Sequence, residues 1–318
     1  MGDRTGIEWT DATWNPVSGC TKVSQACKGC YAERLFPRAY AKSGRRFTDV
    51  QCHPERLDQP LRWKRPRRIF VNSMSDLFHE NVPFEFIDEV FHVMARAKQH
   101  TFQILTKRPK RMHYYINSAL NGRVLQIGGG IGMHMRKPLP NVWLGVSVED
   151  QQTADERVPV LLRTPAALRF LSCEPLLGFL DLDHEWLVSE YYTHSSECHS
   201  EHCALAAGEY DCAGVVVEQP SIGWVIVGGE SGPSARCELH PDWVRHLREQ
   251  CVAARVPFFF KQWGNWAPCF SAAELSIDGE VRVRVGDFTG WMKSTKREAG
   301  REIDGRTWDE VPTLKALT

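Results

Sequence analysis

The chain has 318 residues, enough to bury one large barrel-like core or two ordinary domains. Its 39 Lys and Arg residues balance its 39 Asp and Glu residues, so any nucleic-acid surface must be a local patch. No apolar run approaches the ~20 residues of a membrane span, and no signal peptide is visible, so we expect a cytoplasmic protein without a membrane partner. Eleven cysteines in such a chain indicate metal or redox use rather than a disulfide framework.

Short apolar segments recur along the chain, and each is followed by a polar or Gly-rich turn. Such continuous runs suit parallel strands that are covered on both faces. The first strand is expected within residues 7–14. The others are expected at residues 68–72, 101–105, 142–146, 168–172, 224–228 and 257–261.

Helical periodicity lies between these segments. A helix is expected from about Ala32, and apolar stripes follow Pro83 and Pro241, of which Pro241 suits the first turn of a helix. The period from strand to strand is roughly 25–35 residues, the size of a βα unit. About seven such units predict an α/β fold, in the form of a full or partial (β/α) barrel.

Three stretches fall outside this repeat. Residues 121–140 are Gly-rich and are expected to form a long loop, and residues 184–221 form an insertion rich in Cys, His and Glu. The barrel is expected to span residues 1–263, including the insertion. Residues 264–318 are expected to form a C-terminal cap with a hairpin at 277–280, or else a small separate subdomain.

Three cysteines near the start carry the strongest chemical signal. Cys20, Cys27 and Cys30 have the spacing Cys-x6-Cys-x2-Cys, and Tyr31 follows the last of them. Three thiolates on one loop can hold three irons of a [4Fe–4S] cluster, which normally takes four thiolates. The fourth iron would then be open to another ligand.

Zinc is the alternative metal at two places. The Cys-x2-Cys half of the motif is a common zinc half-site, to which Cys52 or His53 could add a ligand. Residues 198–203, Cys-His-x2-His-Cys, and Cys212 could hold a structural zinc within the insertion, although their spacing matches no standard finger. A solvated variable loop is the other interpretation of the insertion.

The cysteine motif resembles that of the radical S-adenosylmethionine (SAM) superfamily. The common spacing there is Cys-x3-Cys-x2-Cys followed by an aromatic residue, so the first gap is three residues longer here. Residues 6–16, Gly-Ile-Glu-Trp-Thr-Asp-Ala-Thr-Trp-Asn-Pro, and residues 300–308 resemble a family of phage-encoded and bacterial radical-SAM-like proteins. That resemblance covers nearly the whole chain. The long first gap is similar to that of an actinobacterial branch related to spore photoproduct lyase.

The resemblance implies an enzyme with a partial barrel, a [4Fe–4S] cluster on the three cysteines, and SAM at the open iron. It also implies reductive cleavage of SAM and an electron donor such as flavodoxin or ferredoxin. For the substrate it favours a DNA photolesion and a lyase reaction, so DNA is the expected partner. Two alternatives remain, a radical SAM enzyme that modifies RNA or a peptide, and a zinc-containing nucleic-acid-binding protein without catalysis.

Polar residues follow the predicted strands, at the carboxyl ends where sites of parallel α/β folds form. The resemblance implies acceptors for the SAM amino group after the second strand. Four cations after the third strand, Lys107, Arg108, Lys110 and Arg111, could meet the SAM carboxylate or a phosphate backbone. Two glutamates could face the sulfonium. An ordinary ion pair is the alternative for each carboxylate. The cofactor-binding candidates are Ser73, Ser75, Asp76, Lys107, Arg108, Glu149 and Glu230.

Two residues are candidates for hydrogen transfer. Cys173 follows the fifth strand, and its thiol is expected to face the pocket. The resemblance to spore photoproduct lyase, where a cysteine returns a hydrogen atom to the substrate, assigns this role to Cys173, whereas core packing is the alternative. Tyr31 is expected to pack against the cluster and SAM or to relay a hydrogen atom. Trp263 and Trp266 are expected to stack on an extruded lesion.

Residues 62–68, Arg-Trp-Lys-Arg-Pro-Arg-Arg, form a basic segment typical of nucleic-acid binding. This segment precedes a strand rather than following one. We therefore expect it on the rim opposite the site, which disfavours contact with the substrate.

Overall fold

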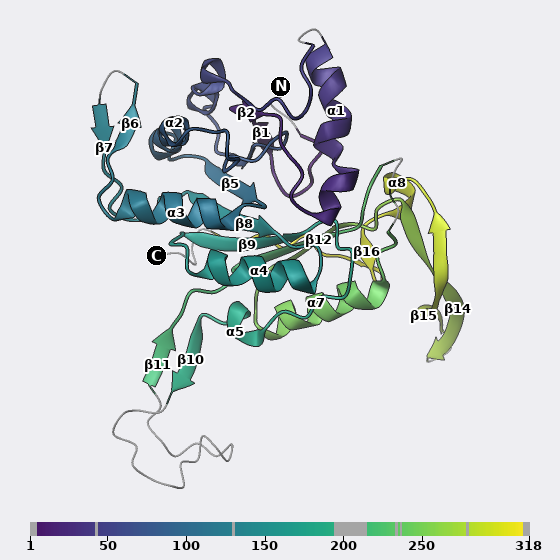
Figure 1. Ribbon diagram of the computed structural model, residues 1–318. Coiled ribbons are helices and arrows are strands. Elements are labelled where there is room, and N and C mark those ends of the chain that lie inside the picture. The colour runs from purple at the N-terminus through teal and green to yellow at the C-terminus, as the bar shows by residue number, and fades with distance from the viewer. Residues whose placement is uncertain are drawn as a thin grey trace.

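Seven parallel strands form a curled sheet at the centre of the computed structural model (Figure 1). The model describes residues 5–41, 44–128, 131–193, 215–232, 235, 237–277 and 280–313. The strands lie side by side in chain order, and the first and last are the two edges, so the fold is a partial α/β barrel. They are β1 (Ala12–Trp14), β4 (Arg68–Val71), β5 (Thr101–Thr106), β8 (Val142–Ser147), β9 (Leu168–Cys173), β12 (Trp224–Gly228) and β13 (Phe258–Gln262).

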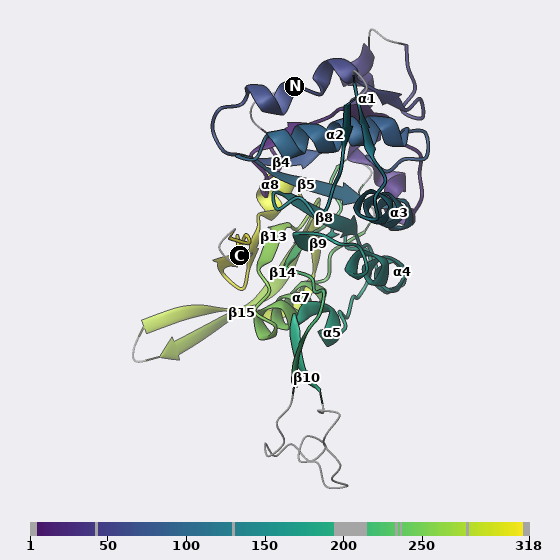
Figure 2. The ribbon, with the colours of Figure 1, turned by 90° about the vertical axis from the view of Figure 1, so that its left-hand side faces the viewer.

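Helices connect the strands and cover the sheet (Figures 1 and 2). Three begin where the sequence predicts a start: next to Ala32, directly after Pro83, and at Pro241. The helices are α1 (Tyr31–Tyr40), α2 (Phe84–Arg96), α3 (Pro109–Leu120), α4 (Gln151–Leu162), α5 (His184–Leu187), α7 (Pro241–Ala253) and α8 (Lys296–Ala299), with 3₁₀ helices η1 (Gln25–Gly29), η3 (Pro54–Arg56) and η4 (Gln59–Arg62). No helix in the described part of the chain is both long and apolar enough to cross a membrane.

The two faces of the sheet carry different apolar clusters. Ile69 and Ile104 on one face share a core with helix residues such as Val90. The alternate strand positions face inward and form a second, largely aromatic cluster. Its members are Trp9, Phe70, Trp143, Leu168, Phe170, Trp224, Ile226 and Phe259. Both faces are therefore buried, which explains why the strands appear in the sequence as continuous apolar runs.

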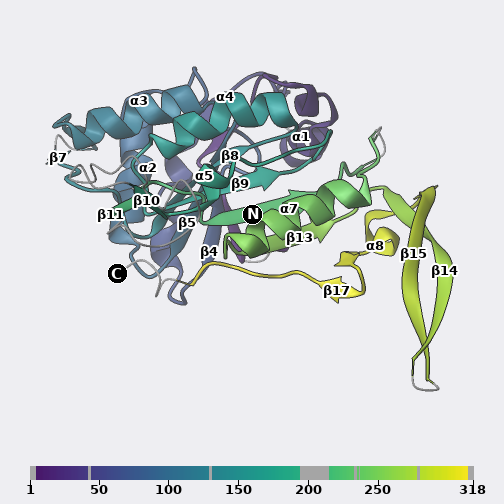
Figure 3. The same cartoon turned by 90° about the horizontal axis from the view of Figure 1, so that it is seen from below.

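Small antiparallel sheets accompany the central one. The β14–β15 hairpin and the β10–β11 strand pair extend away from the body (Figures 1 and 2), and Figure 3 shows the β14–β15 arm from below. The predicted hairpin turn is confirmed, because Ile277 pairs with Glu280. The pairs are β2 (Val17–Ser18) with β3 (Gln51–Cys52), β6 (Leu125–Ile127) with β7 (Ile131–Met133), β10 (Glu190–Thr193) with β11 (Val215–Glu218), β14 (Trp266–Ile277) with β15 (Glu280–Lys293), and β16 (Glu302–Ile303) with β17 (Arg306–Thr307).

Two predicted irregular stretches differ in outcome. The prediction of a long loop over residues 121–140 is wrong, because β6 and β7 form an antiparallel pair there. Buried Asp88 of α2 anchors this hairpin, since its carboxylate accepts a hydrogen bond from the Gln126 backbone N–H at 2.9 Å and pairs with Arg123 at 2.8 Å. Such a tertiary anchor is invisible in local composition. Within the insertion, the predicted zinc ligands from residue 198 to Cys212 lie outside the described residues.

Candidate active site

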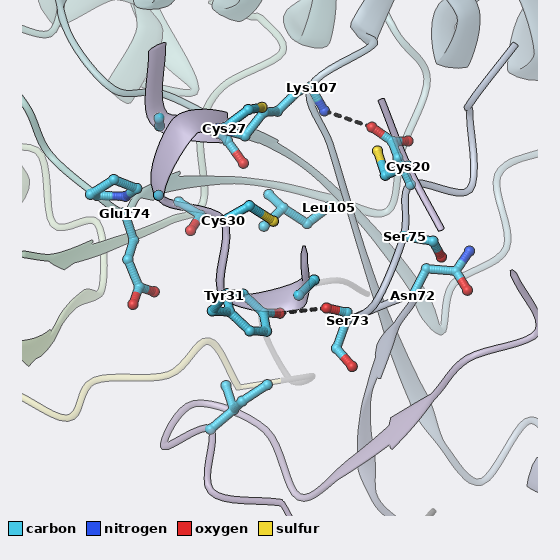
Figure 4. A pocket seen from close by; sticks show the side chains of 18 of the residues that line it. Cys20, Cys27, Cys30, Tyr31, Asn72, Ser73, Ser75, Leu105, Lys107 and Glu174 are labelled. Carbon is cyan, nitrogen blue, oxygen red and sulfur yellow. Dashed lines mark hydrogen bonds between the residues drawn. The ribbon is translucent and has the colours of Figure 1, made fainter. Parts of the chain in front are cut away.

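A cavity of about 370 Å³ lies at the carboxyl ends of the strands (Figure 4). Trp9, Phe70 and Leu105, which belong to the inner cluster or pack against it, form its apolar part. The strand ends meet at one rim, as the parallel arrangement predicts. The polar lining includes Ser73, Ser75 and Asp76 after β4, Lys107 and Arg108 after β5, Ser147 from β8, Ser172 and Glu174 at the end of β9, Glu230 and Ser231 after β12, and Lys261 from β13.

The three cysteines of the motif line this cavity together. Their sulfur atoms surround one shared space in Figure 4. All three are free thiols of intermediate exposure. Cys27 belongs to η1 and Cys30 directly precedes α1, so local helical structure fixes their spacing.

The position of Cys20 depends instead on the glycine that precedes it. Gly19 has a φ of +87°, a left-handed conformation that favours glycine. A Cβ atom at this position would lie 2.7 Å from the Phe47 carbonyl oxygen and 2.8 Å from that of Asp49. The close approach allows the Cys20 backbone N–H to donate to the Phe47 carbonyl at 2.9 Å. Gly19 therefore aims Cys20 into the cavity.

Three thiols lining one cavity match the number of thiolates that a [4Fe–4S] cluster with one open iron would take. A zinc ion draws its thiolates to about 2.3 Å, whereas a [4Fe–4S] cluster places each thiolate on a separate iron. The predicted extra zinc ligands do not join the cysteines. Neither Cys52 nor His53 lines the cavity, and His53 contacts Ser18 at 2.7 Å and Glu55 at 2.9 Å.

The three thiols differ in how readily they ionise. Burial raises the pKa of Cys20 to about 11 and also raises the pKa of Cys30. Burial opposes ionisation of Cys27 as well, but the positive charge of Lys107 and local hydrogen bonds overcome it and lower the Cys27 pKa. The environment of the motif is therefore electrostatically uneven, with its most favourable thiolate position at Cys27.

The three candidates after β4 line the cavity but also serve the surrounding fold. Asp76 accepts hydrogen bonds from the Thr106 hydroxyl at 2.8 Å and the Lys107 backbone N–H at 3.1 Å. The Ser73 hydroxyl donates to the Asn15 side chain, and that of Ser75 donates to the Val17 carbonyl. The serine oxygens can still accept a hydrogen bond from a ligand. The Asp76 carboxylate is already shared among protein donors.

The two glutamate candidates occupy different places. Glu149 is 1% exposed, does not line the cavity, and forms ion pairs with Lys107 and Arg157. Glu230 does line the cavity, and its Oε2 accepts from the Cys237 backbone N–H at 3.2 Å. Its Oε1 lies so close to Gly29 that a Cβ there would clash. Glu230 therefore joins the loop after β12 to the cysteine motif.

Tyr31 also lines the cavity, and its hydroxyl is tied to the loop after β4. The hydroxyl donates to the Ser73 carbonyl at 2.6 Å, a bond drawn in Figure 4. Burial of this group raises the pKa of Tyr31, so the phenol keeps its proton. The hydrogen bond connects the start of α1 to the loop after β4.

Cys173 lies on the other face of the sheet from the one expected. Its thiol is fully buried in the main core and is absent from the cavity lining. The reason is strand alternation: Ser172 and Glu174 face the cavity, so the residue between them faces outward. Burial raises the pKa of Cys173 to about 12. The prediction that this thiol faces the pocket is wrong, and core packing accounts for it.

The two tryptophans proposed to grip a base do not line the cavity either. Trp263 is 4% exposed, belongs to the main core, and donates its indole N–H to the Glu302 carbonyl at 3.0 Å. Trp266 begins the β14 arm. A Trp after a strand end can thus be a core residue, and the aromatic faces on the cavity come from other positions.

Two polar pairs of the rim are absent from the predicted site residues. Ser147 and Ser172 are register partners on β8 and β9, and both line the cavity. Glu174 and Lys261 also line it and form an ion pair at 2.5 Å. The available signal was strand parity, since all these side chains occupy the inward alternate positions. The sequence shows which strand positions share a face of the sheet, but the fold is needed to know which of the two faces lines the cavity.

The basic segment before β4 lies at the amino end of that strand, opposite the cavity rim. The Arg68 side chain pairs with Asp11 at 3.0 Å, and the Arg67 guanidinium stacks over Trp63 at 4.9 Å. These residues are used in local contacts, in agreement with the predicted placement on the opposite rim.

Fold and site together define a partial α/β barrel with a three-cysteine cavity at its carboxyl rim. The chain belongs to the DUF5131 family, described as a protein of unknown function, whose model matches residues 4–312. Comparison with curated proteins finds no match. Among solved structures, a cysteine-to-serine mutant of spore photoproduct lyase aligns with a TM-score of 0.37 and 8% identity, over 90% of this chain and 69% of that one.

Proposed function

We propose that this protein is a radical SAM enzyme in which Cys20, Cys27 and Cys30 hold a [4Fe–4S] cluster and SAM occupies the adjoining cavity. One observation carries the proposal: three free thiols open into one cavity at the carboxyl ends of a parallel barrel. When bound, such a cluster supplies the electron for reductive cleavage of SAM.

The rim residues are suited to hold a cationic sulfonium ligand with amino and hydroxyl groups. Glu230 supplies a carboxylate that attracts positive charge, and the Ser73 and Ser75 oxygens can accept from an amino group. Ser147 and Ser172 offer neighbouring hydroxyls on the cavity wall. The apolar part around Trp9 provides a low-polarity wall that strengthens electrostatic contacts with the ligand.

For the substrate, we propose a DNA photolesion, on the strength of the motif resemblance to spore photoproduct lyase. The cavity lining includes Tyr31 and Phe47, two aromatic side chains that are at least partly exposed and against which an extruded base can stack. The proposed electron donor is a flavodoxin or ferredoxin. Lys22 and Lys28 are exposed on the cysteine segment, where a negatively charged donor can approach.

The first test is electron paramagnetic resonance of anaerobically reconstituted, dithionite-reduced protein with and without SAM, together with iron and zinc analysis. We expect a [4Fe–4S]⁺ signal that SAM alters. Cys30→Ala should lose it, whereas Cys269→Ser, a partly exposed cysteine on β14, should keep it. A protein that binds zinc alone, or a cluster that ignores SAM, contradicts the proposal.

The substrate requires its own experiment. Production of 5′-deoxyadenosine and loss of lesion should be followed with UV-irradiated DNA, undamaged DNA and RNA in parallel. Turnover confined to irradiated DNA supports the photolesion. Turnover with RNA alone, or with a peptide, would keep the radical chemistry and replace the substrate class.

A further inference from the structure

The segment between Cys20 and Cys27 is the long gap of the cysteine motif, and two consecutive cations after β5 hold it. Ordering six residues costs conformational freedom that contacts must offset. The shorter gap between Cys27 and Cys30 is covered by η1. The long gap instead meets the side chains of Lys107 and Arg108, which reach its opposite ends.

Arg108 holds the Cys20 end. Its Nη2 donates to the Thr21 carbonyl at 3.2 Å and to the Thr21 hydroxyl at 2.9 Å, and its Nη1 lies 3.6 Å from the Cys20 sulfur. Asp76 at 3.2 Å and Glu80 at 3.0 Å fix the buried guanidinium from the other side. A planar fork can make these contacts together, whereas a lysine ammonium cannot.

Lys107 holds the Cys27 end through Ser24. Its Nζ pairs with Glu149 and lies 3.4 Å from the Ser24 hydroxyl, which donates to Glu149 at 2.7 Å. The same hydroxyl is 3.6 Å from the Cys27 sulfur. Ser24 therefore links the positive charge of Lys107 to the Cys27 sulfur.

We propose that Lys107 and Arg108 are positioning residues that hold the Cys20–Cys27 segment in its cluster-binding shape and make the cluster easier to reduce. The inference rests on the proposed function. Reduction adds one electron from the donor protein while the thiolates stay bound, so the cluster becomes more negative. Nearby positive charge and N–H···S contacts stabilise that state and shift the potential upward.

The test compares four full-length reconstituted variants with the wild type: Lys107→Met, Arg108→Met, Arg108→Lys and Lys110→Met. Lys110 is the matched control, because it is exposed in the first turn of α3 and its side chain has no hydrogen bond or ion pair among the described residues. The readouts are the cluster midpoint potential from redox-poised electron paramagnetic resonance, iron per chain, and amide hydrogen exchange over residues 20–27.

We expect Lys107→Met and Arg108→Met to shift the midpoint to more negative potential and to speed exchange over residues 20–27, with Lys110→Met unchanged. Arg108→Lys keeps the positive charge but loses the planar guanidinium. Amide hydrogen exchange over residues 20–27 should therefore be faster than in the wild type, with a smaller shift in midpoint potential than in Arg108→Met. Equal shifts in Lys110→Met, or wild-type potential and exchange in Arg108→Met, would overturn the inference.

The outcome also separates this inference from the proposed function. If the wild type takes up no cluster, the proposed function fails and the effect on potential fails with it. Segment holding is then decided by hydrogen exchange of the same proteins: faster exchange over residues 20–27 in Arg108→Met but not in Lys110→Met supports it, and equal exchange rejects it. Thermal unfolding of each variant shows whether a change is local or global.

Discussion

Glu149 is a buried carboxylate shared by two cations and a hydroxyl. Lys107, Arg157 and Ser24 all contact its Oε1, and the side chain is 1% exposed. Glu149→Gln would leave buried Arg157 and partly buried Lys107 without their counter-charge. Removing one partner of a buried pair typically costs about 3 kcal/mol, so we expect a loss of that size in the free energy of unfolding at pH 7, measured by urea denaturation.

The pH dependence of that loss has a definite sign. Burial opposes ionisation of Glu149, but Lys107 and the hydrogen bonds lower its pKa below the ordinary 4.5. Its stabilising contribution is therefore present above pH 4.5 and is lost as the pH falls through the folded-state pKa. Glu156→Gln, an exposed change on α4, the helix that begins just after Glu149, is the control. A pH-independent difference between wild type and Glu149→Gln would contradict this account.

At the scale of elements, the neighbouring strands β8 and β9 pack closely because a glycine on β8 leaves room for an aromatic ring on β9. Gly145 faces the inner cluster, and the Phe170 ring occupies the space of its absent Cβ at 2.5 Å. Gly145→Ala forces this buried ring to move, and overpacking of that kind costs about 1–3 kcal/mol. We expect a lower Tm for Gly145→Ala by calorimetry. Gly178→Ala should be near neutral, because a Cβ there would meet only ordinary contact at 3.6 Å, and equal effects would refute the packing argument.

The turn between β16 and β17 is held to α7 by a carboxylate. Asp304 and Gly305 both have positive φ, the conformation of a tight hairpin turn, and the Asp304 carboxylate accepts from Arg245 and Arg248 of α7 at 2.8 and 2.7 Å. Asn also tolerates this backbone, so Asp304→Asn tests the charge alone. We expect a loss of about 1 kcal/mol at pH 7, since the pair is partly exposed.

The sign of the pH effect again follows from the direction of the shift. Although burial opposes ionisation, the hydrogen bonds from the two arginines lower the Asp304 pKa below 3.8. The contribution is present above pH 3.8 and fades as the pH falls further. Asp304→Ala adds backbone strain at positive φ and should cost more in chemical denaturation. Wild-type stability in Asp304→Asn would contradict the charge argument, and equal losses for Asn and Ala would contradict the strain argument.

At the scale of the whole molecule, the strand order and the shared rim were predictable because each strand is apolar on both faces and ends in polar residues. The face of an individual side chain was not. Ser172 and Cys173 both end the same strand, and only the direction of curl decides which of them meets the cavity. The 121–140 hairpin depends on buried Asp88, and the contacts of Arg108 with the cysteine segment likewise join residues far apart in the chain.

The open barrel leaves β13 as an edge strand, and the chain's own C-terminal segment covers it. Asp309 forms an antiparallel bridge with Phe259, and the Phe260 backbone N–H donates to the Trp308 carbonyl at 2.9 Å. The Glu310 carbonyl accepts from the Trp224 indole at 2.9 Å, and Val311 packs against the inner cluster. An exposed edge strand invites pairing with other chains, so this cover protects the whole molecule.

Truncation after Gly305 should therefore expose the β13 edge and part of the aromatic inner cluster. We expect a Tm lower by at least about 5 °C and increased light scattering on heating, because hydrogen bonds and apolar burial are lost together. Truncation after Thr313 keeps every contact named for the segment and is the control. Equal Tm and equal scattering in the two truncated proteins would show that the segment does not protect the edge.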